Sequence, residues 1–382
     1  MPLKFGKGAE SVLKTDTKPE APEAIPETKK PAPTGGTPLS TILKAIQKEK
    51  GEGSVLKGNQ VPKVERIPTG VFEFDFATGG GFPQGRMSIV FGVESSGKTN
   101  LCLKAIAHIQ KAFPEHCNKC AFVDLEGTFD PFWAAQMGVD TEALILLKPL
   151  NGEEAVDMVD AVMRASDLAL CVVDSIAVMV STREVEASAD KADVGTSPIL
   201  VKRMCNKAAI ALGEESRKGH YPALILINQR RFKIGVMFGD PETMPGGETM
   251  KFLSSLTVRM TGKNVADKTV HPDKPVYKNT SVTVKKSKVP INSASFEYDM
   301  AMVPVGDLDV GDTDSWTTVS NHLKTMGTLV NTGAGWTLFG ETYKTLVPIK
   351  EQYFCDPLFR VKCQQLVVQS VAGSTLMVAD KT

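Results

Sequence analysis

The sequence has no net charge and no long apolar segment. Its 382 residues include 44 Lys and Arg against 44 Asp and Glu, so any nucleic-acid binding must come from a local basic surface. No stretch is long and apolar enough to span a bilayer, and the N-terminal MPLKFGKGAE has no apolar signal core. We therefore expect a cytoplasmic protein that has no membrane partner.

Cysteine is also scarce, and the number of cysteines, seven, is odd. Most lie in apolar runs such as LALCVVD, which favours reduced thiols over disulfides. Cys117 and Cys120 form a C-x-x-C preceded by His116, but no second pair follows at zinc-ligand spacing. Ordinary thiols are therefore favoured over a metal site.

The first 65 residues are not expected to belong to the main core. Residues 1–37 are rich in Pro, Lys, Glu and Thr and lack periodic apolar residues, which is typical of a disordered tail. In residues 38–65, Leu39, Ile42 and Ile46 recur at helical spacing until Gly51, which predicts a short helix and then a linker. So short a helix cannot bury its own apolar stripe, so we expect it to dock on the core or on a neighbouring subunit.

Residues 66–302 alternate apolar strands with amphipathic helices. The expected strands are rich in branched apolar residues and end in polar residues: Ser88–Phe91, Cys120–Asp124, Leu168–Asp174 and Leu224–Asn228, with a helix over Asn100–Ala112. We predict an α/β core with a mostly parallel sheet flanked by helices, and with functional groups at the carboxyl ends of the strands. Residues 303–382 differ in composition and are expected to form a small separate domain.

The segment GVESSGKT, residues 92–99, fits the phosphate-loop pattern between a strand and a helix. Its glycines would let backbone N–H groups wrap phosphates, while Lys98 would reach the β- and γ-phosphates and the Thr99 hydroxyl would ligate magnesium. The strand LALCVVD ends in Asp174, whose carboxylate could hold the magnesium or its waters. A merely glycine-rich turn is the alternative, and the flanking strand and helix disfavour it.

Two further strand ends carry side chains suited to hydrolysis. CAFVDLEG places Asp124 and Glu126 on one face of an extended chain, and Glu126, further out, is the better candidate for the base that orients water. A solvated acid at the start of a loop is the alternative. ILINQ ends in Asn228 and Gln229, neutral amides that could hydrogen-bond a γ-phosphate and sense the nucleotide state.

The next segment, RRFKIGVMFGDPETMPGG (230–247), mixes the cations Arg230, Arg231 and Lys233 with apolar residues and glycines. Basic residues can meet phosphates and apolar side chains can enter between bases, which favours a nucleic-acid-binding loop. Its position beside Gln229 suggests that nucleotide state and loop order are coupled. A surface loop with its apolar residues turned inward is the alternative.

Together these motifs resemble those of the RecA-type DNA strand-exchange recombinases of bacteria or bacteriophages. VESSGKT closely matches the phosphate loop of that family, CAFVDLEGTFDPFWAAQMGVD its strand and turn after the first helix, VVDSIA its metal-side strand, and INQRRFKIGVMFGDPET its second DNA-binding loop. The similarity runs from about residue 39 to about residue 302 and then weakens, although GTLVNTGAGW still resembles the small C-terminal domain.

The resemblance implies a RecA-like P-loop ATPase core that binds ATP and Mg²⁺ and forms helical filaments on single-stranded DNA. The filament would pair its strand with homologous double-stranded DNA, and single-strand-binding and loader proteins would be further partners. A short N-terminal docking helix and a small C-terminal α/β domain would complete the fold.

The resemblance also implies roles for residues at matched positions. The catalytic set would be Glu126 as base, Lys98, Gln229 as γ-phosphate sensor, and Lys286 and Lys288, which would reach the ATP of the next subunit. The nucleotide contacts would come from Gly92, Glu94, Ser95, Ser96, Gly97, Lys98, Thr99, Asn100, Asp130 and Trp133. The DNA contacts would come from Arg203, Arg230, Arg231, Phe232, Lys233, Ile234, Gly235, Val236, Met237, Phe238, Gly246 and Gly247.

The chain also departs from the family at several positions. Trp133 stands where the family has Tyr, Asn100 replaces a second hydroxyl, and Glu248 replaces an Asn near the DNA backbone. The first DNA loop, within residues 184–196, scarcely resembles the family, and the N-terminal tail is extra. These departures indicate a divergent member, bacterial or phage-encoded.

Two other classes of function stay open at this point. A hexameric helicase could be built on the same core, but helicases tend to lack a KIGVMFG-type loop and an N-terminal docking helix. A mediator protein that binds ATP without hydrolysing it is disfavoured by the intact phosphate-loop and acidic residues.

Overall fold

The computed structural model describes residues 37–112, 119–186, 196–232 and 242–370, and the chain divides into two units, Met1–Gly51 and Glu52–Thr382. Within those described ranges, no helix is long and apolar enough to cross a membrane.

Helix α1 (Leu39–Lys50) lies in the first unit. It follows Pro38 and ends at Gly51, whose φ of 92° lies in the region that favours glycine. The side chains of Leu39, Ile42 and Ile46 are exposed. The short amphipathic helix expected from the sequence is therefore present, and the place where its apolar stripe docks stays a prediction.

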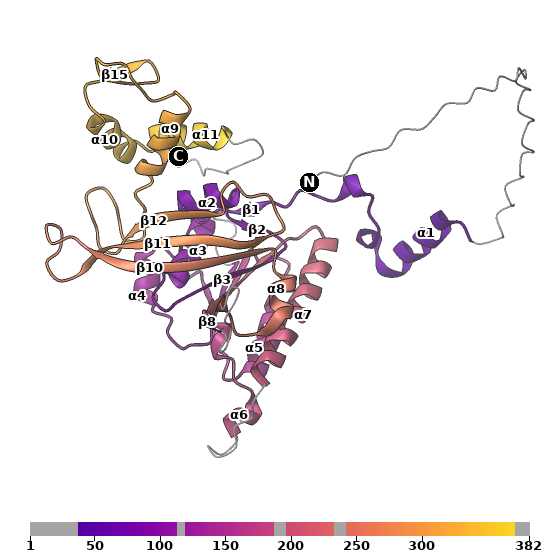
Figure 1. The fold of residues 1–382 in the computed structure, drawn as a ribbon. Coiled ribbons are helices and arrows are strands. Elements are labelled where there is room, and N and C mark those ends of the chain that lie inside the picture. The colour runs from indigo at the N-terminus through magenta and orange to yellow at the C-terminus, as the bar shows by residue number, and fades with distance from the viewer. Residues whose placement is uncertain (1–36, 113–118, 187–195, 233–241, 371–382) are drawn as a thin grey trace, which may run out of the picture. The chain divides into compact units, whose positions relative to one another are not determined.

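An eight-stranded sheet forms the centre of the second unit (Figure 1). In order across the sheet, its strands are β12 (Ser295–Ala301), β11 (Pro275–Ser287), β10 (Leu256–Ala266), β3 (Met87–Gly92), β7 (Ala223–Gln229), β6 (Leu170–Asp174), β4 (Cys120–Asp124) and β5 (Ile145–Leu147). The strands from β10 to β5 are parallel, and β11 and β12 join the edge of the sheet antiparallel. The predicted mostly parallel sheet is confirmed, with β3, β4, β6 and β7 at the expected places.

The other elements of the second unit are helices and short strands. The helices described in the second unit are η1 (Glu52–Ser54), η2 (Gly58–Gln60), α2 (Phe72–Thr78), α3 (Lys98–Ala112), α4 (Pro131–Gln136), α5 (Gly152–Val162), η4 (Ile176–Val178), α6 (Thr182–Glu186), α7 (Thr196–Arg217), α8 (Gly247–Leu253), α9 (Trp316–Thr325), α10 (Val347–Cys355) and α11 (Pro357–Gln369). Strand β1 (Arg66–Ile67) pairs with β2 (Phe82–Pro83), β8 (Arg231–Phe232) pairs with β9 (Glu242–Thr243), and a small antiparallel sheet contains β13 (Val330–Asn331), β14 (Trp336–Leu338) and β15 (Glu341–Tyr343).

Two apolar cores lie on the two faces of the central sheet. Helices α2, α3 and α4 contribute to one core, in which Leu101 is fully buried. Helices α5, α7 and α8 contribute to the other, in which Met204 is buried. Every residue of β6 is buried because its apolar run faces both cores, as expected for a central parallel strand.

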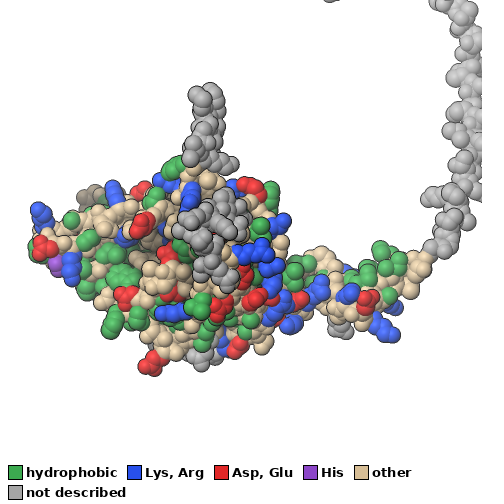
Figure 2. Space-filling view, turned by 90° about the horizontal axis from the view of Figure 1, so that it is seen from below, with side chains coloured by type: hydrophobic (Ala, Val, Ile, Leu, Met, Phe, Trp, Pro, Cys, Tyr) green, Lys and Arg blue, Asp and Glu red, His purple; other side chains and the backbone are tan. Residues whose placement is uncertain are grey.

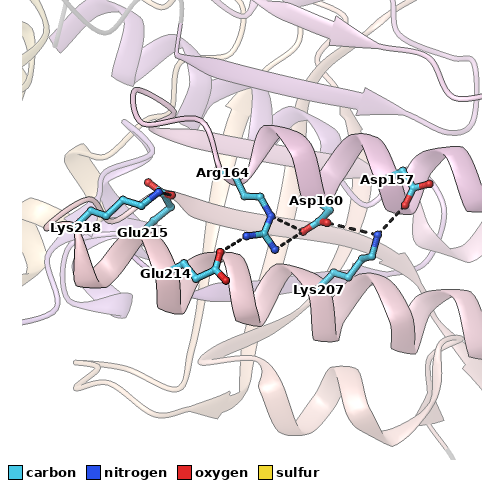
Figure 3. Close-up of polar contacts among 7 residues, drawn as sticks. All are labelled: Asp157, Asp160, Arg164, Lys207, Glu214, Glu215 and Lys218. Carbon is cyan, nitrogen blue, oxygen red and sulfur yellow. Dashed lines mark hydrogen bonds and ion pairs between the residues drawn. The ribbon is translucent and has the colours of Figure 1, made fainter. Parts of the chain in front are cut away.

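A run of ion pairs joins α5 to α7 beyond their apolar contact (Figure 3). Arg164, just after α5, pairs with Asp160 at 3.0 Å and with Glu214 of α7. Lys207 of α7 reaches back to Asp157 at 2.7 Å. These side chains are partly exposed, so we expect each pair to add little to stability.

The residues after β12 build a third core, and α2 belongs to it as well. Trp316, Tyr353 and other residues of α9, α10 and α11 are buried together with Phe72 and Phe76 of α2. The Phe76 ring lies edge-on to His322 of α9, with centroids 4.9 Å apart. Helix α2 therefore packs on the sheet with one face and on the C-terminal helices with the other. The proposed domain boundary after residue 302 stays a prediction.

Glu73 is a carboxylic acid buried in this contact between α2 and the C-terminal helices. Its side chain is 3% exposed, and Oε2 has no hydrogen-bond partner among the described residues. Burial raises the pKa of Glu73 to about 8, outweighing a hydrogen bond to Thr318, and the nearby Asp314 carboxylate raises it further. The folded protein therefore favours the neutral acid, whereas the unfolded chain ionises near the ordinary value for Glu.

The raised pKa of Glu73 makes the free energy of unfolding fall as pH rises. Because the pKa is raised in the folded state, the contribution of Glu73 is fully present below about pH 4, and it is lost as pH rises through about 8. We expect Glu73→Gln to unfold like the unaltered protein near pH 4.5. At pH 9 it should be more stable, by more than the roughly 1.4 kcal/mol that one pKa unit is worth.

Urea unfolding of both proteins between pH 4.5 and 9 measures this difference. Glu297→Gln, at an exposed site on β12, is the control and should show no such trend. A difference between Glu73→Gln and the unaltered protein that does not change with pH would contradict the prediction.

Candidate functional site

The loop between β3 and α3 has the backbone that a phosphate cradle requires. A Cβ at Gly92 would lie 2.0 Å from the Met260 carbonyl oxygen of β10, so only glycine fits there. Ser95 and Gly97 have positive φ values of 56° and 88°, which turn the chain so that successive N–H groups can converge. The Ser96 hydroxyl donates to the Val93 carbonyl oxygen at 2.8 Å and braces the turn.

Lys98, the first residue of α3, is 9% exposed and folds back over this loop. Its Nζ donates to the Val93 carbonyl oxygen at 2.7 Å. Burial lowers the pKa of Lys98, and the Asp174 and Glu126 carboxylates act in the opposite direction. The ammonium group is thus held where a phosphate could take the place of the carbonyl oxygen.

Thr99 and Asp174 meet although they lie 75 residues apart in the chain. The Thr99 hydroxyl donates to Asp174 Oδ2 at 2.7 Å. Burial raises the pKa of Asp174 to about 6, against the hydrogen bond from Thr99. A hydroxyl and a carboxylate oxygen suit Mg²⁺, which prefers oxygen ligands, keeps several waters and takes others from phosphates. In the described part of the chain, no group of three or more His, Cys, Asp or Glu could hold a metal by itself.

Glu126 lies just beyond β4, exposed and facing the end of β6. Its carboxylate accepts hydrogen bonds from the Ser175 hydroxyl and from Gln229 Nε2, the latter at 3.5 Å. Asp124, by contrast, accepts from the backbone N–H groups of Thr128 and Phe129 at 3.1 Å each and so holds the turn. The geometry thus leaves Glu126 available for chemistry, and its role as base stays a prediction.

Trp133 of α4 and Asn100 of α3 are bonded to each other. The indole Nε1–H donates to Asn100 Oδ1 at 3.0 Å. Asp130 caps α4 by accepting from the N–H groups of Phe132 and Trp133. A cavity of about 250 Å³ lies beside this pair and reaches Thr99 and Asp174. The two departures from the family pattern at positions 100 and 133 are therefore in direct contact.

The ends of the predicted DNA loop meet in the β8–β9 pair. Arg231 pairs with Thr243 and Phe232 with Glu242, while the N–H of Arg230 donates to the Gly92 carbonyl oxygen at 3.0 Å. The loop is therefore anchored directly beside the phosphate loop. Several predicted contacts lie outside the described residues, namely Lys233, Ile234, Gly235, Val236, Met237 and Phe238, as does most of the first DNA loop.

A cluster of cations surrounds Glu242 at the base of this loop. The Glu242 carboxylate lies 3.5 Å from Arg230, 3.5 Å from Arg259 and 3.2 Å from Lys285. Lys285 is the extra residue of a β-bulge between β10 and β11. With three cations to one acid, the cluster is locally positive in a chain without net charge. Figure 2 shows Lys and Arg side chains gathered beside Asp and Glu on the face seen from below.

The other predicted DNA residues are found on two helices. Arg203 is exposed on α7, while Gly246 caps the start of α8 and Gly247 is its first residue. Glu248 follows them and pairs with Lys251 at 2.7 Å.

Lys286 and Lys288 lie at the opposite edge of the sheet from the phosphate loop. Lys286 pairs with Thr257 of β10, and the N–H of Lys288 donates to the carbonyl oxygen of Ser255. The N–H of Ser255 in turn donates to the carbonyl oxygen of Met87, at the start of β3. Both side chains donate to the Phe252 carbonyl oxygen at the end of α8. The phosphate loop follows Gly92, at the other end of β3, so these lysines lie far from the phosphate loop of their own chain.

Sequence reasoning missed two residues of this site. Ser175 directly follows the Asp174 strand end, so its adjacency to a candidate ligand was a usable signal. Lys278 of β11 donates from Nζ to the Ser95 carbonyl oxygen at 2.8 Å, and nothing in the local sequence indicated that it would. Of the C-x-x-C motif, the structure describes only Cys120, which is buried in β4. Cys117 and the preceding His116 lie outside the described residues.

Comparison with known proteins identifies the fold's family. A family model described as the RecA N-terminal domain matches residues 37–303. Protein RecA of Kineococcus radiotolerans is 40% identical over 264 residues, which cover 68% of this chain and 72% of that protein. Protein RecA of Thermus aquaticus is 38% identical over 279 residues, covering 71% of this chain and 78% of that one.

The mitochondrial DNA repair protein recA homolog of Dictyostelium discoideum is 37% identical over 267 residues, 68% of this chain and 56% of that protein. The chain thus spans little more than half of this longer relative. A solved structure of the RadB recombinase is 23% identical with a TM-score of 0.45, covering 62% of this chain and 96% of that one, and adds nothing to the assignment.

The contribution of the Asn100–Trp133 hydrogen bond to stability can be measured by a double-mutant cycle. We expect Asn100→Ala to lower the free energy of unfolding by about 0.5–1.5 kcal/mol, the usual net value of such a bond. In a Trp133→Phe background the same change should cost almost nothing, because the donor has gone. Urea unfolding without nucleotide checks both values, and equal costs in the two backgrounds would contradict the contact.

Proposed function

Because this chain belongs to the RecA family, we propose that it is an ATP-dependent recombinase that pairs single-stranded DNA with homologous duplex. The observation that supports the proposal is that the phosphate loop and the candidate DNA loop lie side by side at the carboxyl ends of the strands. The phosphate loop follows β3, and the candidate DNA loop follows the adjacent β7 and is bonded to Gly92 through the Arg230 N–H. A nucleotide bound at the phosphate loop and a DNA strand bound at the DNA loop would both contact the backbone around the bond between Arg230 and Gly92.

ATP and Mg²⁺ are the cofactors that the residues fit. The phosphate-loop N–H groups and Lys98 would hold the triphosphate, Thr99 and Asp174 would hold Mg²⁺ or its waters, and Trp133 would stack on the base. Bound Mg²⁺ would supply neutralisation of the phosphate charge.

Glu126 would act as the base for hydrolysis. Its carboxylate is oriented by the Ser175 hydroxyl and by the Gln229 amide. Gln229 is the last residue of β7 and immediately precedes Arg230 and β8. A γ-phosphate that bonds the Gln229 amide would therefore compete with Glu126 for it, and the change would pass along the backbone into the DNA loop.

The active form would be a head-to-tail filament. Lys286 and Lys288 lie at the sheet edge opposite their own phosphate loop, which favours contact with the nucleotide of a neighbouring subunit. Helix α1, with its exposed apolar stripe, suits the same kind of repeating contact. Such a filament in the cytoplasm would hold DNA through backbone and stacking contacts and leave sequence checking to base pairing. Single-strand-binding and loader proteins would assist its assembly.

Formation of a D-loop between a single strand and homologous supercoiled duplex tests the recombinase directly. We expect the unaltered protein to form D-loops with ATP and Mg²⁺, and Lys98→Ala to lose at least about 100-fold in rate because it lacks the phosphate-binding cation. A protein that binds DNA and ATP but forms no D-loops would contradict the proposal, and closed rings on DNA seen by microscopy would favour a helicase.

A mixing experiment tests whether the lysines act on the neighbouring subunit. Glu126→Gln and the double variant Lys286→Ala, Lys288→Ala should each lose DNA-dependent ATP hydrolysis. When the two are mixed in equal amounts, about a quarter of the interfaces should combine two intact halves, so about a quarter of the activity should return. Lysines that served their own subunit would give no recovery.

A further inference from the structure

A buried lysine, Lys278, lies against the outside of the phosphate loop. It is on β11, its residue is 7% exposed, and its Nζ donates to the Ser95 carbonyl oxygen at 2.8 Å. Its side chain also packs on the loop, since a Cβ placed at Gly97 would lie 3.4 Å from Lys278 Cδ. Lys278 therefore bonds to Ser95 and lies close to Gly97.

In the part of the chain that the structure describes, no acid balances the ammonium group of Lys278. Among the described residues it forms no ion pair, and the one hydrogen bond it makes is to the Ser95 carbonyl oxygen. Burial alone lowers the pKa of Lys278, with no neighbouring charge acting in either direction. A buried cation without a partner anion destabilises a folded protein, because the charge loses its hydration and gains no comparable interaction.

The position of this cation suggests what balances it. The N–H groups of the phosphate loop would converge on the bound anion, while the Ser95 carbonyl oxygen accepts from Lys278. The charge of Lys278 thus lies one peptide group behind a site that would bind several negative charges. In a buried, low-dielectric setting, its attraction for a polyphosphate is much less screened than that of a surface lysine.

We propose that Lys278 is a positioning residue for the nucleotide, which locks the phosphate loop through Ser95 and adds a second positive charge behind the triphosphate. This inference rests on the proposed nucleotide site. Lys98 would touch the phosphates, whereas Lys278 acts through the loop backbone. The protein without nucleotide carries an unbalanced buried charge, and the bound polyphosphate supplies the missing anion.

The proposal predicts opposite effects on stability and on binding. Lys278→Met keeps the length and packing of the side chain and removes the charge. Without nucleotide, its urea unfolding midpoint should rise above that of the unaltered protein. Its Kd for ADP with Mg²⁺, measured by calorimetry, should be weaker by about 10-fold. Because the buried charge is little screened by salt, the loss of affinity between 50 mM and 500 mM salt should be about the same in this variant as in the unaltered protein.

Two matched variants complete the design. Lys263→Met removes an exposed lysine from the neighbouring strand β10 and should change neither the midpoint nor the Kd. Lys278→Arg keeps the charge and should bind ADP nearly as well as the unaltered protein.

Other results would overturn the inference. If Lys278→Met lowers the unfolding midpoint, the lysine has only a structural role. If its Kd for ADP equals that of the unaltered protein, the charge does not act on the nucleotide. Failure of the proposed function is a different result: the unaltered protein would then bind no ADP, or bind it no better than Lys98→Ala.

Discussion

Parallel backbone pairing among β3, β7, β6 and β4 brings four strand ends to one edge of the sheet, and the site depends on this arrangement. The pairing continues past β4, where the N–H of Leu125 donates to the Asp174 carbonyl oxygen at 2.7 Å. That bond holds the start of the Glu126 segment against the end of β6. The contacts of Thr99 with Asp174 and of Glu126 with Gln229 then join groups from different strand ends, in each case across one intervening strand. The cores on both faces bury these strands.

Strand β11 is long enough to reach both ends of β3. It carries Lys278 near the phosphate loop of its own chain and Lys286 near the opposite edge, eight residues further along. At about 3.3 Å per residue these two lysines lie on the order of 26 Å apart. In the proposed filament, one strand would serve two nucleotide sites, one in its own subunit and one in a neighbour. In such an assembly, ATP binding and subunit contact would depend on the same element.

Several features of the fold and site could be predicted from sequence because they are local. Helical periodicity predicted α1, and apolar runs predicted the central strands. The Gly-Lys-Thr motif identified Lys98 and Thr99 as candidate phosphate and magnesium ligands. The choice of Glu126 over Asp124 followed from its place beyond the strand end. Other contacts could not be predicted, because they join residues far apart in sequence whose own neighbourhoods are unremarkable. The contact of Lys278 with Ser95, made from a strand of alternating burial, and the bond between Trp133 and Asn100 are of this kind.

By itself, the sequence determined the elements, their order and the chemical groups at each strand end, since these follow from local patterns of apolar, glycine and charged residues. Only the tertiary structure decided which groups share a site and which charged groups are buried. It buried Glu73 in the contact between α2 and the C-terminal helices, and it buried the Lys278 ammonium behind the phosphate loop. The energy of a charge depends on burial and on nearby opposite charges, and both are set by packing rather than by position in the chain.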